Sequence, residues 1–407
     1  MKNFSKIINS FIKTKQFFFL IILFLIVITG TVIYLYQFSK TSRNKKIKLE
    51  LLWSKSFNSK IIKINHLSNF IVENNRQPEF PIKTVLTEKK LIIFNNKGKI
   101  NKEVSVLSNE RYDISKNGMV FAKLIKNQIV ILTDSFKTIG TINLNIRRPV
   151  ILAEHLSFAL TPDGKNIIVL SYIQNTIYFY QVDGKLLNTH KIEYLYGATV
   201  KFSGNNKYVA IHIPSWGKGK TNGYLLLLTN KGKQLQKFDH KGCQADFDLS
   251  KNAKNIVIAA KEEIVCYNRK GDVILLQKDD SGGIKIDMSD DGRYLAVTKQ
   301  IDHSVELIDI ISGNTLWNFQ LKGFDEINSP LVSLDISEYG NYISVVVGKE
   351  WSNKNQFFNA YIINKSGTAI WQKSFNTKVN NHCFSSDEKY VLFSGVHNIY
   401  LYHTVLY

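Results

Sequence analysis

The sequence predicts an all-β protein whose main domain is a β-propeller, preceded by one transmembrane helix. Three observations predict this: a segment that recurs about every 45 residues, short apolar runs separated by Gly-containing turns, and no helical periodicity longer than a turn or two after Lys48. Of the 407 residues, 44% are hydrophobic and 21% charged, with six Pro and three Cys. This composition excludes a disordered, collagen-like or disulfide-stapled chain.

The first element is an uncharged stretch of twenty residues, 17–36, with the sequence FFFLIILFLIVITGTVIYLY. At 1.5 Å per residue, a helix of this length is about 30 Å long, which matches the hydrocarbon core of a bilayer. A cleaved signal peptide has a shorter apolar core and a small-x-small site, whereas Tyr34, Tyr36 and Phe38 stand here, so an uncleaved anchor is predicted. The predicted organisation is a basic cytoplasmic tail over 1–16, a transmembrane helix over 17–36, a basic linker over 37–47 and a propeller over 48–407.

The orientation of this anchor is not given by charge, because four basic residues precede the span and five follow it before Leu49. A short basic tail, one span and a large C-terminal domain form the plan of a signal anchor, which favours a propeller on the extracytoplasmic side of the cell membrane. Cys243, Cys266 and Cys383 are an odd, sparse set inside apparent strands, so we interpret them as small buried hydrophobes rather than disulfide partners.

The repeat carries a hydroxyl residue after an apolar one, then a polar or Gly-containing turn, then a β-rich run, as in DMSDDGRYLAV from Asp287. Successive hydroxyls are separated by 46, 42, 47, 39, 48 and 48 residues, a spacing typical of four-stranded propeller blades. We call these seven residues the marker hydroxyls: Ser115, Thr161, Ser203, Ser250, Ser289, Ser337 and Ser385.

Each repeat predicts four strands, A to D, with the marker turn between A and B and a Lys-Gly type turn between C and D. One further blade is predicted between Phe57 and Ser108, which makes eight, with seven as the alternative if that region is only an excursion. The last repeat ends without a D strand, while an unpaired copy, LLWSKSF, begins at Leu51. The sequence therefore predicts that the N-terminal strand closes the ring, so that no sheet edge is left free.

The A and B segments resemble blades of WD-repeat and Tol-type propellers. The segments VELIDIISGNTLWNFQL from Val305 and AYIINKSGTAIWQKSF from Ala360 resemble the pyrroloquinoline-quinone-type repeat, in which a Gly turn leads to a Trp-bearing strand. In overall plan the chain is similar to membrane-anchored, eight-bladed quinoprotein-like proteins of bacteria. The resemblance covers the whole region after the anchor and implies the fold, whereas a function does not follow from it.

No catalytic or cofactor signature accompanies the repeat, so we expect no cofactor, no metal site of recognisable spacing and no catalytic residue. The adjacent cysteine pair of quinone dehydrogenases, a Gly-x-Ser-x-Gly elbow, a His-Glu-x-x-His and a Cys-x-x-Cys are all missing. Asp163, Asp291 and Asp387 lie in the marker turns, where Asp accepts hydrogen bonds from its own backbone. Trp53, Trp317 and Trp371 recur at one strand position and are predicted to pack between blades.

Candidate binding residues come from places where the repeat is broken, because insertions in repeat proteins collect on one face. Three long connections are predicted between strands B and C, at 74–84, 214–223 and 348–356, and we therefore expect them to share a face. They join aromatic and basic side chains, which suit a protein or anionic-polymer partner; ordinary solvated loops are the alternative. The candidate residues are Arg76, Phe80, Trp216, Lys218, Lys220, Lys349, Trp351 and Lys354.

The net charge of the chain is a weaker indication of the binding partner than these loops are. The chain carries +20, but nine of its basic residues and none of its acidic ones lie in 1–48, which leaves +11 for the rest from 44 basic and 33 acidic residues. The basic run beside the span suits anionic headgroups better than nucleic acid, which we do not expect as a partner.

The favoured function is a non-catalytic binding or scaffolding module. The alternative is a propeller-type enzyme, such as a lyase or lactonase, that uses A-strand carboxylates such as Asp246, Asp248, Asp287 and Asp335 at the central channel. The oligomeric state is left open.

Overall fold

The computed structural model describes residues 47–57, 61–64, 84–87, 89–94, 99–106, 111–125, 127–144, 156–215, 222–242, 245–260, 263–278, 285–299, 301–321, 331–348 and 358–406. The chain divides into two compact units, residues 1–48 with 405–407 and residues 49–404. The second unit is the propeller. The predicted tail, helix and nearly all of the linker lie outside the described residues, and no helix among the described ones is long and apolar enough to cross a membrane.

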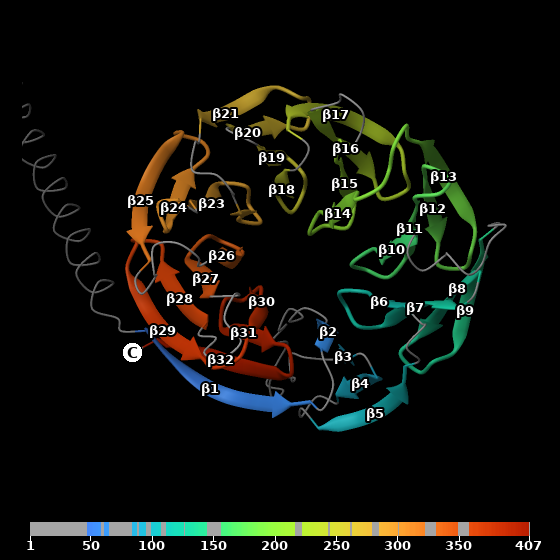
Figure 1. Ribbon diagram of the computed structural model, residues 1–407, viewed down its shortest axis with the longest axis horizontal. Coiled ribbons are helices and arrows are strands. Elements are labelled where there is room, and N and C mark those ends of the chain that lie inside the picture. The colour runs from blue at the N-terminus through green and yellow to red at the C-terminus, as the bar shows by residue number, and fades with distance from the viewer. Residues whose placement is uncertain are drawn as a thin grey trace, which may run out of the picture. The chain divides into compact units, whose positions relative to one another are not determined.

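The described strands form eight four-stranded sheets, the blades, arranged in a ring (Figure 1). This confirms the all-β class and eight blades rather than seven. Blade 1 consists of β2 (Ile61–Ile64), β3 (Thr84–Thr87), β4 (Lys90–Phe94) and β5 (Ile100–Ser105). Blade 2 consists of β6 (Arg111–Ile114), β7 (Val120–Ile125), β8 (Gln128–Thr133) and β9 (Thr138–Asn143). Blade 3 consists of β10 (Leu156–Leu160), β11 (Asn166–Ser171), β12 (Thr176–Gln181) and β13 (Leu186–Lys191). Blade 4 consists of β14 (Thr199–Phe202), β15 (Tyr208–Ile213), β16 (Asn222–Thr229) and β17 (Gln234–Lys241).

The second half of the ring repeats this order. Blade 5 consists of β18 (Asp246–Leu249), β19 (Asn255–Ala260), β20 (Glu263–Asn268) and β21 (Val273–Lys278). Blade 6 consists of β22 (Ile286–Met288), β23 (Tyr294–Lys299), β24 (Ser304–Asp309) and β25 (Asn314–Gln320). Blade 7 consists of β26 (Leu331–Ile336), β27 (Tyr342–Gly348), β28 (Phe358–Asn364) and β29 (Ala369–Phe375). Blade 8 consists of β30 (Val379–Phe384), β31 (Tyr390–Gly395), β32 (Asn398–Leu406) and the N-terminal β1 (Ile47–Ser56).

Strand A of each blade lies nearest the centre of the ring and strand D at its outer rim (Figure 1). This order explains the residue patterns of the strands. The B strand β11 reads NIIVLS and is buried along its whole length, because blades cover both of its faces. The D strand β25 alternates between exposed and half-buried residues, because one of its faces meets solvent.

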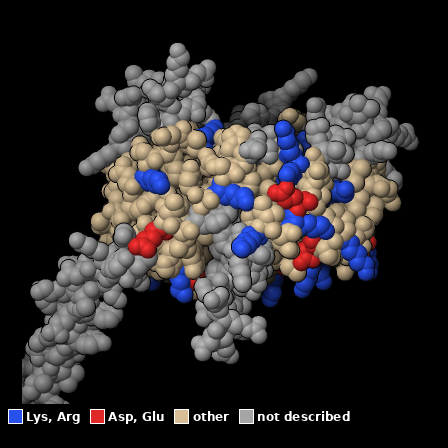
Figure 2. Space-filling model, turned by 90° about the horizontal axis from the view of Figure 1, so that it is seen from below, with Lys and Arg blue, Asp and Glu red and all other residues tan. Residues whose placement is uncertain are grey.

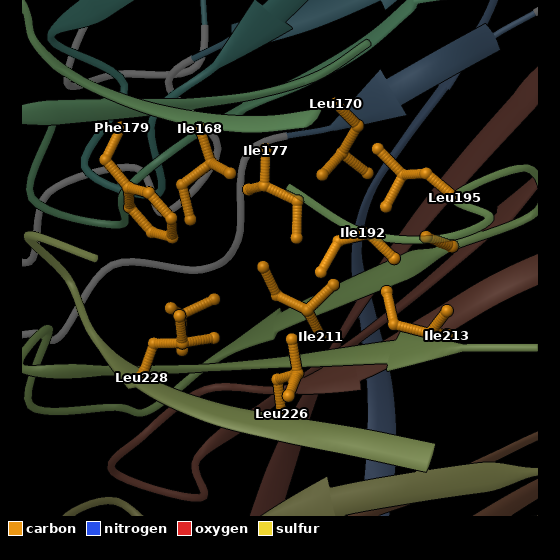
Figure 3. Packing of buried hydrophobic residues seen from close by; sticks show 12 residues of the cluster. Ile168, Leu170, Ile177, Phe179, Ile192, Leu195, Ile211, Ile213, Leu226 and Leu228 are labelled. Atoms are coloured by element: carbon orange, nitrogen blue, oxygen red, sulfur yellow. The ribbon is translucent and has the colours of Figure 1, made fainter. Parts of the chain in front are cut away.

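The hydrophobic core lies between blades. One cluster joins Ile168 and Phe179 of blade 3 to Ile211 and Leu228 of blade 4, and Figure 3 shows these side chains pointing toward one another across the gap. Corresponding clusters join blades 1 and 2, 2 and 3, 4 and 5, 5 and 6, 6 and 7, and 8 and 1. Apolar side chains shared between neighbouring blades therefore stabilise each of these blade pairs.

The N-terminal strand closes the ring, as predicted. Strand β1 pairs with β32 as the outermost strand of blade 8 (Figure 1). At the end of β1, the Ser56 hydroxyl donates to the Asn398 side chain at 2.6 Å, and the N–H of the next residue, Phe57, donates to the His397 carbonyl at 2.8 Å. The first strand of the propeller thus completes its last blade.

One predicted connection is wrong. The segment 74–84 was assigned between strands B and C, but in blade 1 it lies between β2 and β3, which are strands A and B. The B–C connection of this blade is instead a tight turn, in which the Thr87 hydroxyl accepts from the Lys90 N–H at 2.9 Å and donates to the Lys90 carbonyl at 3.0 Å. Blade 1 has no marker hydroxyl, so nothing in its sequence distinguished strand A from strand B.

Candidate binding face and central channel

The eight candidate binding residues all lie outside the described residues. The strands that flank them are described. Residues 214–221 join β15 to β16 and residues 349–357 join β27 to β28, so both are B–C connections, which confirms that assignment for Trp216, Trp351 and their neighbouring lysines. Arg76 and Phe80 belong to an A–B connection, which leaves its blade at the opposite end. We call the end of the ring that carries the B–C and D–A connections the binding face.

A cavity of about 320 Å³ opens where blades 1, 2 and 3 meet at the binding face. Its lining comes from the ends of β3 and β5 and from the beginnings of the A strands β6 and β10. The lining residues are Leu86, Val106, Arg111, Tyr112, Leu156, Ser157 and Phe158. The cavity is thus mostly apolar and aromatic, with one cation and one hydroxyl, which is the composition typical of ligand pockets.

The cation of this cavity is held in place by the neighbouring blade. The exposed side chain of Arg111 donates from Nη1 to the Leu156 carbonyl at 3.0 Å, which ties blade 2 to blade 3. A guanidinium has five N–H donors, so one such bond fixes its position while further donors remain for an anionic group.

Tyr172 lies close to the same arginine and contacts a second tyrosine. The Tyr172 ring meets the Tyr196 ring edge-on at 5.6 Å between centroids, and the Tyr172 hydroxyl is hydrogen-bonded to Ser157. Burial raises the pKa of Tyr172, although Ser157 and the positive charge of Arg111 oppose this. The hydroxyl is therefore neutral and available as a polar contact beside an apolar cavity.

Elsewhere, at the ends of blade 4 strands on the binding face, the structure brings together two histidines that the sequence did not connect. His212 and His240 are each the last residue but one of strands B and D. Their Nε2 atoms are 3.0 Å apart, with the rings stacked at 5.0 Å between centroids. The intervening strand C contributes Gly223, opposite His240. A Cβ at Gly223 would lie only 2.7 Å from Cε1 of His240, so a glycine is required for His240 to reach across strand C. His212 pairs with Leu225 and His240 pairs with Gly223, so the two histidines meet diagonally across strand C and no local sequence pattern connects them.

At the centre of the ring, the A-strand carboxylates connect consecutive blades. An aspartate two residues before a marker hydroxyl accepts a hydrogen bond from a backbone N–H of the next A strand. This occurs at Asp113 with Leu160 (2.7 Å), Asp248 with Met288 (2.9 Å), Asp287 with Ile336 (2.8 Å) and Asp335 with Phe384 (3.0 Å). We call these contacts the aspartate clamps. The carboxylates considered as catalytic candidates are therefore engaged in joining blades.

Blade 4 carries a lysine where other blades carry the clamp aspartate. The Lys201 Nζ lies 3.7 Å from Asp248 Oδ1 and 3.9 Å from Asp246 Oδ1 on blade 5. Burial alone would lower the pKa of Lys201, but Asp248 and Asp246 raise it above its usual value, so the ammonium stays charged. The aspartates at the centre of the ring thus have a cationic partner on the neighbouring blade.

The next two clamp carboxylates have the opposite behaviour. Burial raises the pKa of Asp287 well above its usual range, and the nearby carboxylates of Asp248 and Asp335 raise it further. Burial likewise raises the pKa of Asp335 to about 7. These aspartates bind protons more readily than ordinary carboxyls because they are crowded together away from water.

The marker hydroxyls are structural. All seven are buried, and each accepts a hydrogen bond from the N–H five residues ahead, as Thr161 does from Asn166 at 3.0 Å. Asp163, Asp291 and Asp387 accept from the marker hydroxyl of their own turn, which confirms the turn interpretation. Cys266 and Cys383 are buried thiols, as predicted, while Cys243 lies outside the described residues. Burial raises the pKa of Cys266 to about 12.

Charge on the outer wall is dispersed. Figure 2 shows one side of the ring, where Lys and Arg side chains are scattered over the described surface and Asp and Glu are fewer. A nucleic-acid-binding surface usually has a continuous basic patch or stripe. The pattern on this side is instead that of a solvated basic protein.

The chain matches no protein-family model and no curated protein. Its fold is similar to that of the C-terminal WD40 domain of Sif2, with a TM-score of 0.56 and 13% identity over 87% of this chain and 98% of that domain. It is also similar to BamB from Moraxella catarrhalis, with a TM-score of 0.55 and 11% identity over 88% of this chain and 100% of that one. A eukaryotic initiation factor matches with a TM-score of 0.55 and 12% identity over 87% and 89% of the two chains. At these identities the likeness establishes the propeller fold and its resemblance to WD-repeat propellers, and nothing about function.

Proposed function

We propose that this chain is a single-pass membrane protein whose propeller lies on the extracytoplasmic side and binds an envelope protein or an anionic polymer without catalysis of its own. The observation that carries the proposal is the cavity at the binding face, where the Arg111 guanidinium lies beside apolar and aromatic residues. An anionic group attached to an apolar or aromatic body fits this combination. The uncharged segment 17–36 supports the membrane attachment.

Loop composition supports the same face. The B–C connections of blades 4 and 7 leave the ring at the end where Arg111 lies, and their sequences pair Trp216 with two lysines and Trp351 with two more. The region after residue 48 has a net charge of +11, which attracts an anionic partner at a distance before any contact forms.

The alternative is an enzyme with its site in the central channel. Against it stands the use of the channel carboxylates, since Asp248, Asp287 and Asp335 each accept an N–H from the next blade. A catalytic acid or base must be free to exchange protons with a substrate. Aspartates that hold strands together are better explained as part of the scaffold.

The proposal is tested by capture from native membranes at matched concentrations of folded protein. Trp216→Ala, Trp351→Ala and Arg111→Ala should each reduce the partner that co-purifies by about tenfold or more, since one aromatic or Arg anchor contributes about 1–3 kcal/mol to an interface. Charge reversal at Lys218, Lys220 and Lys349 should weaken capture, and most strongly at low salt. Trp317→Ala, on the rim of the ring, is the matched control and should leave capture by folded protein unchanged. If the loop and Arg111 variants retain the same material as the wild type, the binding face is not the site.

A further inference from the structure

The histidine pair of blade 4 has a spacing that also suits two ligands of one metal ion. The two Nε2 atoms face each other at 3.0 Å. Two nitrogens bound to one metal ion at about 2.05 Å lie about 2.9 Å apart when they are cis in a square-planar site and about 3.3 Å apart in a tetrahedral one. The observed separation falls between these values, so an ion could be held with only small ring movements.

The tautomer of His240 suits a metal ligand. Its Nδ1 lies 3.2 Å from the Lys241 carbonyl, and a carbonyl only accepts, so Nδ1 carries the proton and Nε2 presents a lone pair to His212. A hydrogen bond from the second ring nitrogen to a backbone carbonyl is the usual way in which proteins orient a histidine that binds a metal.

The position of the pair allows access from solvent and fixes its geometry. His212 is buried, whereas His240 is partly exposed on the binding face. Gly223 provides the space over which the His240 ring crosses strand C, because an added Cβ would lie 2.8 Å from its Nε2. Phe247 of blade 5 packs 5.9 Å from His212, between ring centroids, and supports that ring from the other side.

We propose that His212 and His240 form a binding site for a divalent transition-metal ion of the Zn²⁺ or Cu²⁺ class, bound through the two Nε2 atoms, with water in other positions. When the ion binds, the proton that His212 donates from Nε2 moves to Nδ1 of the same ring, so both imidazoles stay neutral. Imidazole nitrogen selects this class of ion, whereas Mg²⁺ and Ca²⁺ prefer oxygen ligands.

The test is titration of the full-length chain with Zn²⁺ by calorimetry, with Mg²⁺ as the ion that should not bind. The wild type should bind one Zn²⁺ at this site, and His240→Gln and His212→Gln should each weaken that binding at least about tenfold. His397→Gln is the matched control, because it removes an exposed histidine elsewhere and should leave the affinity unchanged. An affinity in His240→Gln equal to that of the wild type, or no saturable Zn²⁺ binding by the wild type, would overturn the proposal.

Folding is checked separately. His240 is partly exposed, so without metal His240→Gln should have the same melting temperature as the wild type. If His212→Gln fails to fold, the Zn²⁺ affinity of His240→Gln alone tests the proposal. Added Zn²⁺ should raise the melting temperature of the wild type and not that of His240→Gln, because only a chain that binds the ion is stabilised by it. Gly223→Ala keeps both imidazoles but displaces His240, and it should also weaken Zn²⁺ binding. Unchanged Zn²⁺ affinity in Gly223→Ala would contradict the proposed geometry.

Discussion

At the outer rim of the ring, one position recurs in each described C–D pairing and contacts the next blade. Every such pairing has a register shift near its end, and the D-strand residue just before the shift points to the neighbouring blade. The residues at this position are Lys102, Gly140, Asn188, Gln236, Leu275, Trp317 and Trp371.

The contacts at this position differ in kind but not in place. The Trp317 Nε1 donates to the Lys365 carbonyl at 2.9 Å, and the Gln236 side chain donates to the Lys270 carbonyl at 2.7 Å. Lys102 lies over the Phe136 ring at 4.3 Å. Gly140 is required because a Cβ there would lie 2.0 Å from the Val182 carbonyl oxygen. Tryptophan is therefore one of several solutions to a single packing problem.

The strand tryptophans should contribute to stability. Trp371 stacks on Phe393 at 5.4 Å between centroids, with an interplanar angle of 22°. Trp371→Ala should lower the free energy of unfolding by about 3 kcal/mol, the lower end for Trp-to-Ala changes because the ring is only partly buried. Denaturant unfolding measures this. Leu316→Ala, at an exposed position on a neighbouring D strand, is the control and should stay within about 0.5 kcal/mol of the wild type. An equal effect of the two changes would contradict the packing role.

The pKa of Asp335 predicts a dependence of stability on pH. Burial raises this pKa to about 7, whereas in the unfolded chain the carboxyl titrates near about 3.9. Between these values the folded state keeps a proton that the unfolded state releases, so the contribution of Asp335 to the free energy of unfolding falls as pH rises from about 4 to 7.

Asp335→Asn separates the charge from the clamp. Its amide oxygen accepts the Phe384 N–H as the carboxylate does, but it cannot ionise. The variant should melt above the wild type at pH 8, and the difference should shrink at pH 5, as thermal unfolding at the two pH values would show. Asp335→Ala loses the acceptor and should melt below Asp335→Asn at both. A difference between Asp335→Asn and the wild type that does not change with pH would show that Asp335 is ionised in the folded protein at pH 5.

Among the elements, β1 has the largest effect on the integrity of the ring. Deleting residues 48–57 should leave β32 as an unpaired edge, which favours aggregation through edge-to-edge pairing. The expected result is a lower melting temperature and soluble aggregates in size-exclusion chromatography. Leu52→Ala keeps the backbone of β1 and changes only an exposed side chain, so it should remain monodisperse. A deletion variant that melts and elutes like the wild type would mean that the ring closes without β1.

The elements that could be predicted from the sequence are those specified by local chemistry. A marker hydroxyl, such as Ser289, bonds to residues two and five positions away, so its signature recurs within each blade and gives the blade count. Blade 1 lacks that hydroxyl, and there the connection at 74–84 was misassigned. The aspartate clamps and the histidine pair join residues 28 to 49 positions apart, so their partners become apparent only in three dimensions. The candidate loop residues remain a prediction.

At the scale of the whole molecule, the sequence predicts that the anchor and the propeller can be separated by truncation. Deleting residues 1–46 should release a folded propeller into the soluble fraction without detergent, because the uncharged segment 17–36 is removed and the strands are kept. Fractionation and circular dichroism of the truncated chain measure this. A truncated chain that still needs detergent would show that the anchor is wrong or incomplete.

A second measurement tests on which side of the membrane the propeller lies. Protease added to intact spheroplasts of an expressing bacterium should digest the propeller of the full-length chain if it is extracytoplasmic. A cytoplasmic protein of the same cells serves as the control for intact membranes. Protection of the propeller under these conditions would overturn its placement.

The closure of blade 8 also sets the order of events during synthesis. Ser56 and Asn398, which touch in the closed ring, are 342 positions apart, so at about 5–20 residues per second a ribosome needs about 20 to 70 seconds to make the second after the first. During that time β1 has no partner strand, while the blades between are made and can pack against one another in turn. The strand of the propeller that is made first can therefore reach its place in the sheet only after the last blade has been made.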